Sequence, residues 1–236
     1  MARPFKFVIV MFVNWLFHGL LYMDRTERAF YVLLEGLLFL PIFFAFSAIA
    51  NLSWRLLSAL IVGHTLHWLF NGHLYVVLRE FGLSRVEKGH FARYAWGLRG
   101  RIAREKSMLA GAIFGSLSRG ELESSSDLDV RFIRRLGFSN GLRACAFTFL
   151  ERSRALLDRF PLDVYVLDTL GPVLRMRVDE SPIILYDPEN VLARTFDQSS
   201  HLEEIRDMMV DKPGERCLTP GLKQVHLSSS SSSHKT

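Results

Sequence analysis

Three aspartates are the residues of this chain whose types and spacing could do chemistry. Asp127 and Asp129 stand two residues apart at the start of an expected strand, so the alternation of side chains places both on one face. Asp163 is the second residue of a later expected strand, 162–167, and completes the set if the two strands are neighbours. Three close carboxylates repel one another unless cations bridge them, and oxygen ligands favour Mg²⁺ over zinc. The pattern predicts two-metal phosphoryl transfer, in which the ions activate the attacking oxygen and neutralise a leaving pyrophosphate.

A glycine–serine turn precedes the aspartates and suits a triphosphate. Gly115 and Ser116 follow the short apolar run 108–114, which reads as a buried strand that ends in a tight turn. Glycine lets the backbone approach phosphates closely, and a serine hydroxyl and the following amides can donate hydrogen bonds to them. Arg119 stands three residues further on, where its guanidinium could clamp a phosphate, and Gly120 lets the loop bend.

Each of these assignments has a competitor. Asp168 competes with Asp163 for the third position, although alternation projects it from the opposite face of its strand. Asp163 could instead be an acid at the edge of a sheet that contacts solvent or an arginine. Arg119 could be a plain surface charge. Glu121 and Glu123 are expected to be solvated loop charges.

Taken together, these pieces resemble the minimal nucleotidyltransferases of the DNA polymerase β superfamily. The resemblance spans about residues 88–195 and is carried by GSLSRG at 115–120, SDLDV at 126–130 and LDV at 162–164. It implies a small mixed α/β sheet flanked by helices, and magnesium-dependent transfer of a nucleoside monophosphate from an NTP to a hydroxyl or phosphate. By position, it implies that the triphosphate is bound by Gly115, Ser116 and Arg119. It likewise implies that two Mg²⁺ ions are held by Asp127, Asp129 and Asp163, with Asp163 or a nearby group activating the acceptor.

The chain departs from this family in two respects. Ser118 stands where many of these enzymes have alanine, and no separate domain for reading a base or a template is evident. Acidic and basic residues nearly balance in residues 107–236, so the broad positive footprint of a nucleic-acid-binding protein is missing. We therefore expect no template nucleic acid as a partner.

The first third of the chain is nearly free of charge. Residues 7–23, 29–50 and 56–78 each approach the roughly 20 residues needed to cross hydrocarbon, which predicts membrane helices in an N-terminal region of residues 1–78. The third segment carries several polar residues, so it either spans the bilayer or lies in its interface. Its polar stripe, expected to face lipid headgroups or a neighbouring helix, consists of His64, His67 and Asn71.

The charges that flank the apolar third predict sidedness. A signal peptide is the alternative for residues 1–23, but no small-x-small cleavage site follows. Residues 79–106 are rich in Lys and Arg and are expected to form a basic juxtamembrane helix, which places the C-terminal part in the cytoplasm and can bind anionic lipids. Cys145 and Cys217 cannot build a disulfide framework, which fits a reducing compartment.

The remaining sequence predicts a nucleotidyltransferase-like domain over residues 107–215 and a disordered serine-rich tail over residues 219–236. The strands are expected at 108–114, 127–133, 162–167 and 183–186, and the helices at about 86–106, 140–160 and 200–210.

These features together predict a multi-pass cell-membrane protein with a cytoplasmic, magnesium-dependent nucleotidyltransferase domain. We expect an NTP as substrate and a small or membrane-bound acceptor, such as a sugar phosphate or a lipid-linked glycan in envelope biosynthesis. Tethering at the bilayer raises the effective concentration of an acceptor held there. The alternative function is a non-catalytic, nucleotide-binding membrane adaptor or regulatory partner.

Overall fold

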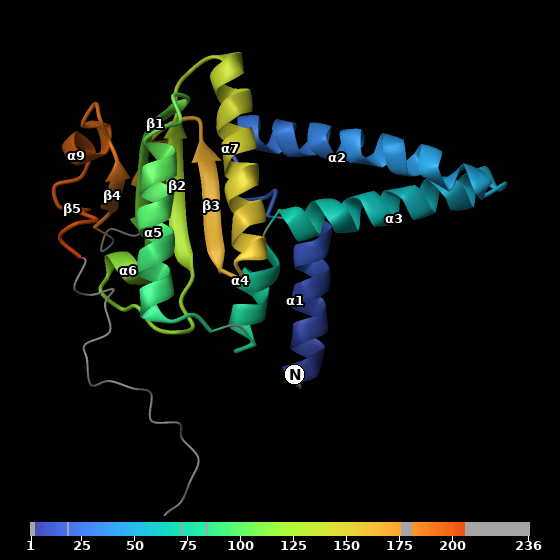
Figure 1. The fold of residues 1–236 in the computed structure, drawn as a ribbon, viewed down its shortest axis with the longest axis horizontal. Helices are drawn as coiled ribbons and strands as arrows, with labels where there is room; N and C mark the ends of the chain where they lie inside the picture. Colours follow the sequence, from blue (N-terminus) through green and yellow to red (C-terminus); the bar gives the residue numbers. More distant parts are fainter. Residues whose placement is uncertain (1–2, 18, 72, 84, 176–180, 206–236) are drawn as a thin grey trace, which may run out of the picture.

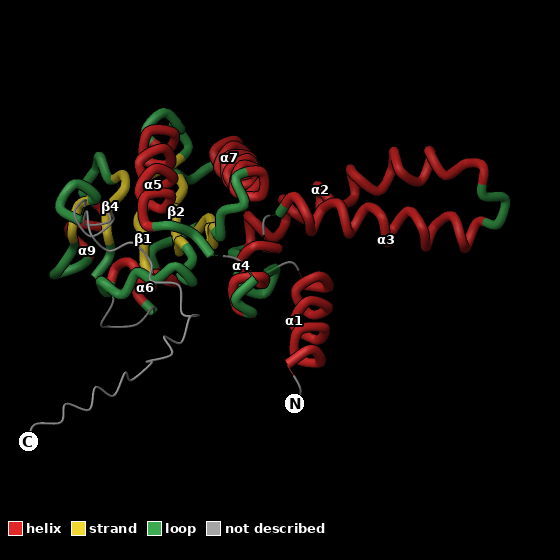
Figure 2. The backbone as a smooth tube through the Cα atoms, turned by 60° about the horizontal axis from the view of Figure 1, so that its bottom comes forward, coloured by secondary structure: helices red, strands yellow, loops and turns green. Residues whose placement is uncertain are grey.

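The computed structural model describes residues 3–17, 19–71, 73–83, 85–175 and 181–205. In this part of the chain, a mixed sheet carries helices on both faces, and two long helices project from it as an arm (Figures 1 and 2). The strands are β1 (Met108–Phe114), β2 (Leu128–Arg134), β3 (Leu162–Leu167), β4 (Ile183–Tyr186) and β5 (Ser200–His201). The helices are α1 (Arg3–Phe17), α2 (Arg25–Ala45), α3 (Leu52–Phe70), α4 (His73–Glu80), α5 (Lys88–Ile102), α6 (Gly115–Ser118), α7 (Phe138–Leu157), α8 (Gly171–Leu174) and α9 (Val191–Thr195), with a 3-10 turn, η1, at Phe46–Ala48.

The sheet has the strand order β3-β2-β1-β4-β5 and confirms the expected mixed α/β class. β1 pairs antiparallel with both β2 and β4, whereas β2 and β3 are parallel. A parallel pair requires a crossover connection, and α7 supplies it. The register of this pair sets Asp129 directly beside Asp163.

The main core lies between the sheet and the helices α5 and α7, which cover one of its faces (Figure 1). Alternation along β2 turns Val130 and Phe132 toward this core. Leu98 and Ile102 of α5 are fully buried there. Residues 79–106 therefore do not form one basic juxtamembrane helix: α4 ends at Glu80 and α5 begins at Lys88. The apolar face of α5 is buried against the sheet, so α5 belongs to the core of the domain.

Most of the remaining elements follow the sequence prediction. The strands β1, β3 and β4 have the predicted bounds, β2 is shifted by one residue, and α7 accounts for the predicted helix at 140–160. The helix expected from Ser200 is wrong in its described part. There, Ser200 and His201 pair with β4, and the Ser200 N–H donates to the Pro182 carbonyl. The rest of that segment and the predicted tail over 219–236 lie outside the described residues.

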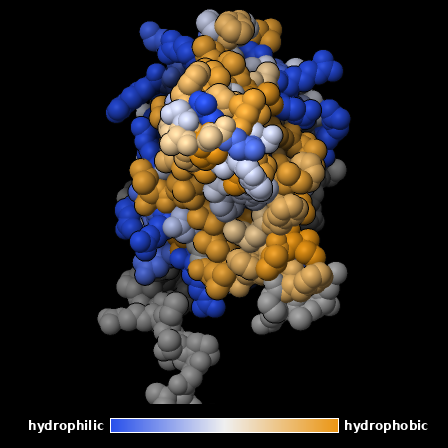
Figure 3. All heavy atoms as spheres, turned by 90° about the vertical axis from the view of Figure 1, so that its right-hand side faces the viewer, coloured by the Kyte–Doolittle hydropathy of each residue, from blue (hydrophilic) through white to orange (hydrophobic). Residues whose placement is uncertain are grey.

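The N-terminal helices correct the expectation of several membrane spans. Of the described helices, one is long and apolar enough to cross a bilayer, namely the 24 residues Arg25–Ala48, which comprise α2 and η1. α1 has 15 residues, too few for about 30 Å of hydrocarbon. The predicted segment 56–78 is broken at Asn71 between α3 and α4. Seen from the tip of the arm, hydrophobic residues cover most of the surface, and hydrophilic residues gather at its edges (Figure 3).

The polar stripe of α3 faces neighbouring helices, which decides between its two predicted orientations. His64 Nδ1 lies 2.5 Å from Glu35 Oε1 of α2, and the other ring nitrogen lies 2.9 Å from the Trp15 carbonyl of α1. The His67 ring stacks on Tyr31. These contacts hold α1, α2 and α3 together at the root of the arm.

A buried ion pair joins the arm to the sheet. Arg152 of α7 is fully buried, and its guanidinium lies 2.9 Å from Glu27 Oε1 of α2 and donates to Asn71 at 2.7 Å. The same guanidinium donates to the Val164 carbonyl of β3, while Glu27 accepts the Val166 N–H at 3.0 Å. α2 is therefore bonded directly to the strand that carries Asp163.

Removing one member of this pair should be costly. We expect Arg152→Met to lower the free energy of unfolding by about 3–5 kcal/mol, because Glu27 is left buried without its cation. The double variant Arg152→Met/Glu27→Gln should regain part of this loss, since no uncompensated charge remains. Thermal unfolding of the purified full chain in detergent measures both. A double variant that unfolds at a lower temperature than Arg152→Met would contradict the assignment.

Candidate functional site

The Gly115 turn is built against Asp129. Gly115 has φ +72°, a conformation that side chains rarely adopt, and a Cβ added there would lie 1.9 Å from Asp129 Oδ2. The antiparallel pairing of Phe114 with Asp129 causes this close approach. Position 115 thus needs glycine for two separate reasons, and the backbone of the turn lies against a carboxylate.

Asp129 and Asp163 lie side by side on the face of the sheet opposite α5 and α7. Arg131 Nη2 lies 3.0 Å from Asp163 Oδ2 and 3.8 Å from Asp129 Oδ1. Those two carboxylate oxygens are therefore within 6.8 Å of each other, the sum of the two distances. The structure thus brings together two of the three predicted aspartates, and it adds an arginine that the sequence analysis missed.

The environment of Asp129 disfavours a negative charge. Burial, followed by the charges of Asp127 and Asp163, raises the pKa of the Asp129 carboxyl to about 8, and Arg131 opposes this shift. Desolvation is thus reinforced by the mutual repulsion of the acids. A divalent cation would relieve that repulsion, because it favours the ionised forms of all three.

This shift predicts how stability depends on pH. A carboxyl whose pKa rises from 3.8 to about 8 on folding binds its proton more tightly in the native state. The free energy of unfolding should therefore fall as the pH rises from about 4 to about 8. Thermal unfolding of the full chain in a chelator, followed across this range, tests it. Asp129→Asn should show a flatter profile, and an identical slope in the variant would contradict the assignment.

A cavity of about 610 Å³ opens at the turn. It is large enough for a nucleotide-sized ligand, and its lining is mostly polar. The predicted site residues that line it are Gly115, Ser116, Arg119, Asp127 and Asp129.

Two side chains of the cavity bear on phosphate binding. The Ser116 hydroxyl is buried and has no hydrogen-bond partner, an unusual state for a buried polar atom. Arg119 is half-buried and lines the cavity, with its Nε donating to Glu121 at 2.9 Å. Glu121, expected to be solvated, is 65% exposed but holds this arginine. Ser116 and Arg119 thus both line the cavity, the first with a buried, unsatisfied hydroxyl and the second with a guanidinium held by Glu121.

The aspartates do not form a closed metal site as they stand. Over the described ranges, no three His, Cys, Asp or Glu side chains are grouped so that they could hold a metal ion. Asp127 lies just before β2 and is half-buried, while Asp163 is bonded to Arg131. The donor set nevertheless fits Mg²⁺, because it consists of oxygens that repel one another beside an unsatisfied serine hydroxyl.

Asp168, the competitor of Asp163, has a structural role at the other end of the strand. It accepts from Arg134 at 2.7 Å and from the Thr26 N–H at 3.2 Å, which fixes the start of α2. The alternative assigned to Asp163 also has support, since β3 is the last strand in the sheet order and Asp163 contacts an arginine. Arg131 could have been found from the sequence, because it stands two residues after Asp129 and so shares its face.

Comparison with protein-family models, curated proteins and solved structures finds no match for this chain. The resemblance to nucleotidyltransferases therefore depends on the residues and geometry described above.

Proposed function

We propose that this chain is a membrane-anchored, magnesium-dependent nucleotidyltransferase that transfers a nucleoside monophosphate from an NTP to a small or membrane-bound acceptor. One observation carries the proposal: Asp129 and Asp163 stand in register on adjacent parallel strands, and Gly115 approaches the first of them too closely for any side chain. In support of the proposal, Asp129 and the Gly115 turn line the same cavity, and Asp163 is the register partner of Asp129.

Each residue has a role in this proposal. The amides of the turn, the Ser116 hydroxyl and the Arg119 guanidinium bind the triphosphate and orient it in the cavity. Asp127, Asp129 and Asp163 would hold Mg²⁺, which would lower the pKa of the attacking hydroxyl and neutralise charge on the leaving pyrophosphate. Arg131 holds the Asp163 carboxylate in place.

Membrane attachment is assigned to α2. It is long and apolar enough to span a bilayer, and only 6% of its most apolar window is buried. α3 packs along it and returns to the catalytic domain, so we propose that the arm inserts into the membrane from one side as a helical hairpin and holds the domain at the cytoplasmic surface. A sugar phosphate or lipid-linked glycan is then an acceptor within reach of the site.

The test is pyrophosphate release from each NTP with Mg²⁺, measured in membranes that carry the full chain. The proposal predicts release with at least one NTP and its loss in Asp127→Asn/Asp129→Asn. Equal release from the wild type and this double variant would refute catalysis by the site.

A second candidate is a nucleotide-binding membrane adaptor without turnover. The observation that favours it is Arg131, whose guanidinium already neutralises Asp163 and lies near Asp129, where a metal ion is expected. This function predicts NTP binding that is independent of Mg²⁺ and no pyrophosphate release. Equilibrium binding of a labelled NTP with and without Mg²⁺ distinguishes the two candidates.

A further inference from the structure

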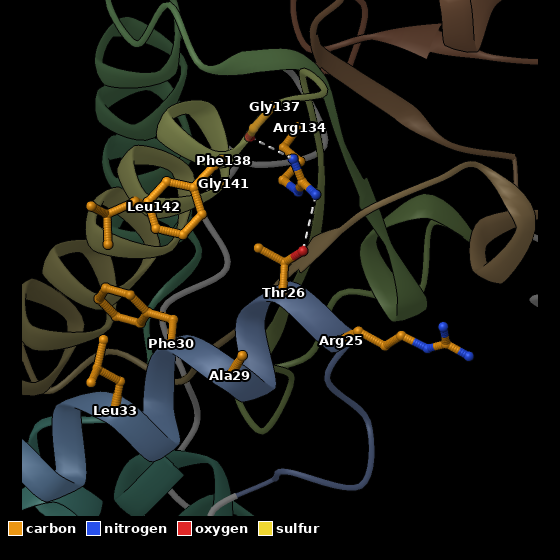
Figure 4. Close-up of a pocket in the computed structure, with 10 residues that line it drawn as sticks. All are labelled: Arg25, Thr26, Ala29, Phe30, Leu33, Arg134, Gly137, Phe138, Gly141 and Leu142. Carbon is orange, nitrogen blue, oxygen red and sulfur yellow. Dashed lines mark hydrogen bonds between the residues drawn. The ribbon is translucent and has the colours of Figure 1, made fainter.

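A second cavity lies between the start of α2 and the start of α7, and it is unlike the first. It measures about 550 Å³ and is lined largely by apolar side chains (Figure 4). It lies near the carboxyl end of β2, where Arg134 is, whereas the candidate catalytic site lies at the opposite end of that strand. We call it the α2–α7 groove. Its position separates it from the chemistry proposed above.

The groove has an apolar end and a basic end. Phe30, Leu33 and Leu142 gather at one end, and the Arg25 side chain extends from the other (Figure 4). Arg134 also lines the groove, where it donates to Asp168 and to Thr26 Oγ1. A ligand that matches this arrangement has an apolar chain and an anionic head.

The apolar end of the groove continues into the surface of the arm. Leu33 begins a row of exposed side chains along one face of α2 that continues with Leu37, Leu40 and Phe44. At 1.5 Å per residue, Leu33 stands about 12 Å further along α2 than Arg25. If α2 enters the bilayer, Arg25 is thus at the level of the headgroups and Leu33 at the level of the acyl chains.

The exposure of the groove is high for a soluble protein. Phe138 is 89% exposed, and Leu33 and Leu142 are 58% and 45% exposed. A patch of large apolar side chains that adjoins an exposed apolar helix indicates contact with a lipid or another apolar partner. The exposed arginine at its basic end favours an anionic lipid over a neutral one.

We propose that the α2–α7 groove binds an anionic phospholipid of the surrounding bilayer, with an acyl chain against Phe30, Leu33, Phe138 and Leu142 and the phosphate near Arg25. This inference depends on the membrane insertion of α2 but not on nucleotidyl transfer. The bound lipid would fix the angle of the arm relative to the sheet, because it contacts an element of each.

The test is native mass spectrometry of the purified full chain in detergent, titrated with phosphatidylglycerol or with phosphatidylcholine of the same acyl chains. The wild type should bind phosphatidylglycerol more tightly. Phe138→Asp and Leu142→Asp should each weaken binding of both lipids by about tenfold, because a charge replaces apolar contact area. Arg25→Gln should weaken phosphatidylglycerol alone, by about fivefold.

The matched control is Leu136→Asp. Leu136 stands two residues before Phe138 and is 78% exposed but lies outside the groove. It should leave both affinities within about twofold of the wild type. Unchanged binding in Phe138→Asp and Leu142→Asp, or an equal loss in Leu136→Asp, would overturn the groove assignment. An equal effect of Arg25→Gln on both lipids would overturn the placement of the headgroup.

Carbonate extraction of the same proteins from membranes separates this proposal from the membrane anchor. All variants should stay in the membrane fraction, because α2 keeps its apolar length. A wild type released by carbonate would contradict insertion of α2 and the groove together. A retained wild type whose lipid binding ignores Phe138→Asp would contradict the groove alone.

Discussion

Asp129→Asn is expected to lower the rate of pyrophosphate release at least about a hundredfold, because it removes the central carboxylate of the proposed metal site. The amide keeps the shape of the side chain, so the fold should be retained. In chelator at neutral pH, the variant should unfold at a higher temperature than the wild type, since the wild-type carboxyl must either take up a proton or bury its charge on folding. Loss of activity together with a gain of stability separates a functional carboxylate from a structural one.

Asp168→Asn is the matched control for this experiment. Asp168 is also a partly buried carboxylate beside the sheet, but its partners are Arg134 and the start of α2. It should lose stability by about 1–3 kcal/mol and keep its activity within a few-fold. If Asp129→Asn keeps wild-type activity, or if Asp168→Asn loses as much, the assignment of the site is wrong.

Gly115→Ala is expected to lower the rate of pyrophosphate release at least about a hundredfold. It should also destabilise the protein by more than the strain of a left-handed backbone alone. The new Cβ would lie 1.9 Å from Asp129 Oδ2, so either the turn or the carboxylate must move. Both groups belong to the proposed site, and displacement by about 1 Å typically costs about a hundredfold in rate. Pyrophosphate release and thermal unfolding of the same preparation measure the two effects.

Gly120→Ala supplies the comparison. Gly120 has φ +74°, nearly the same as Gly115, but an added Cβ would meet no atom within 4 Å. It should cost only about 1–2 kcal/mol of backbone strain, with little change in activity. Equal losses in the two variants would show that strain alone, and no contact with Asp129, explains the need for glycine at position 115.

The individual strands of the sheet were predictable from local sequence pattern. The strands 108–114 and 162–167 are short apolar runs bounded by turn residues, and the structure has them with the same bounds. The turn at Gly115 and the placement of Asp129 beside Asp163 follow from strand alternation once the strands are paired. No local sequence pattern predicts which strands pair, so the parallel pairing of β2 with β3 and its register are known only from the structure.

The N-terminal third shows where sequence reasoning fails. Hydropathy predicted two or three spans, whereas α1 is too short and α3 returns along α2. Composition alone cannot reveal that Glu35 and His64 pair between helices, or that Glu27 is buried against Arg152 and bonded to β3. Such contacts depend on where the arm docks. The helix expected at 200–210 failed for a similar reason, because pairing with β4 overrides local propensity.

The arm and the candidate site are connected by a chain of contacts. Arg152 lies over the Tyr165 ring at 5.1 Å, and Arg131 lies over the same ring at 4.9 Å. Arg131 holds Asp163, and Arg152 holds Glu27 of α2. The contacts therefore run from Glu27 of α2 through Arg152, the Tyr165 ring and Arg131 to Asp163. A change in the angle of the arm has a physical route to the carboxylates through them.

The most direct measurement of the central claim is electron paramagnetic resonance of Mn²⁺, used as a substitute for Mg²⁺, with the full chain and a non-hydrolysable NTP analogue. We expect the wild type to bind Mn²⁺ more tightly when the analogue is present. Asp129→Asn/Asp163→Asn should lose this binding, whereas Asp168→Asn should keep it. Binding of Mn²⁺ that is the same in the wild type and in Asp129→Asn/Asp163→Asn would contradict it.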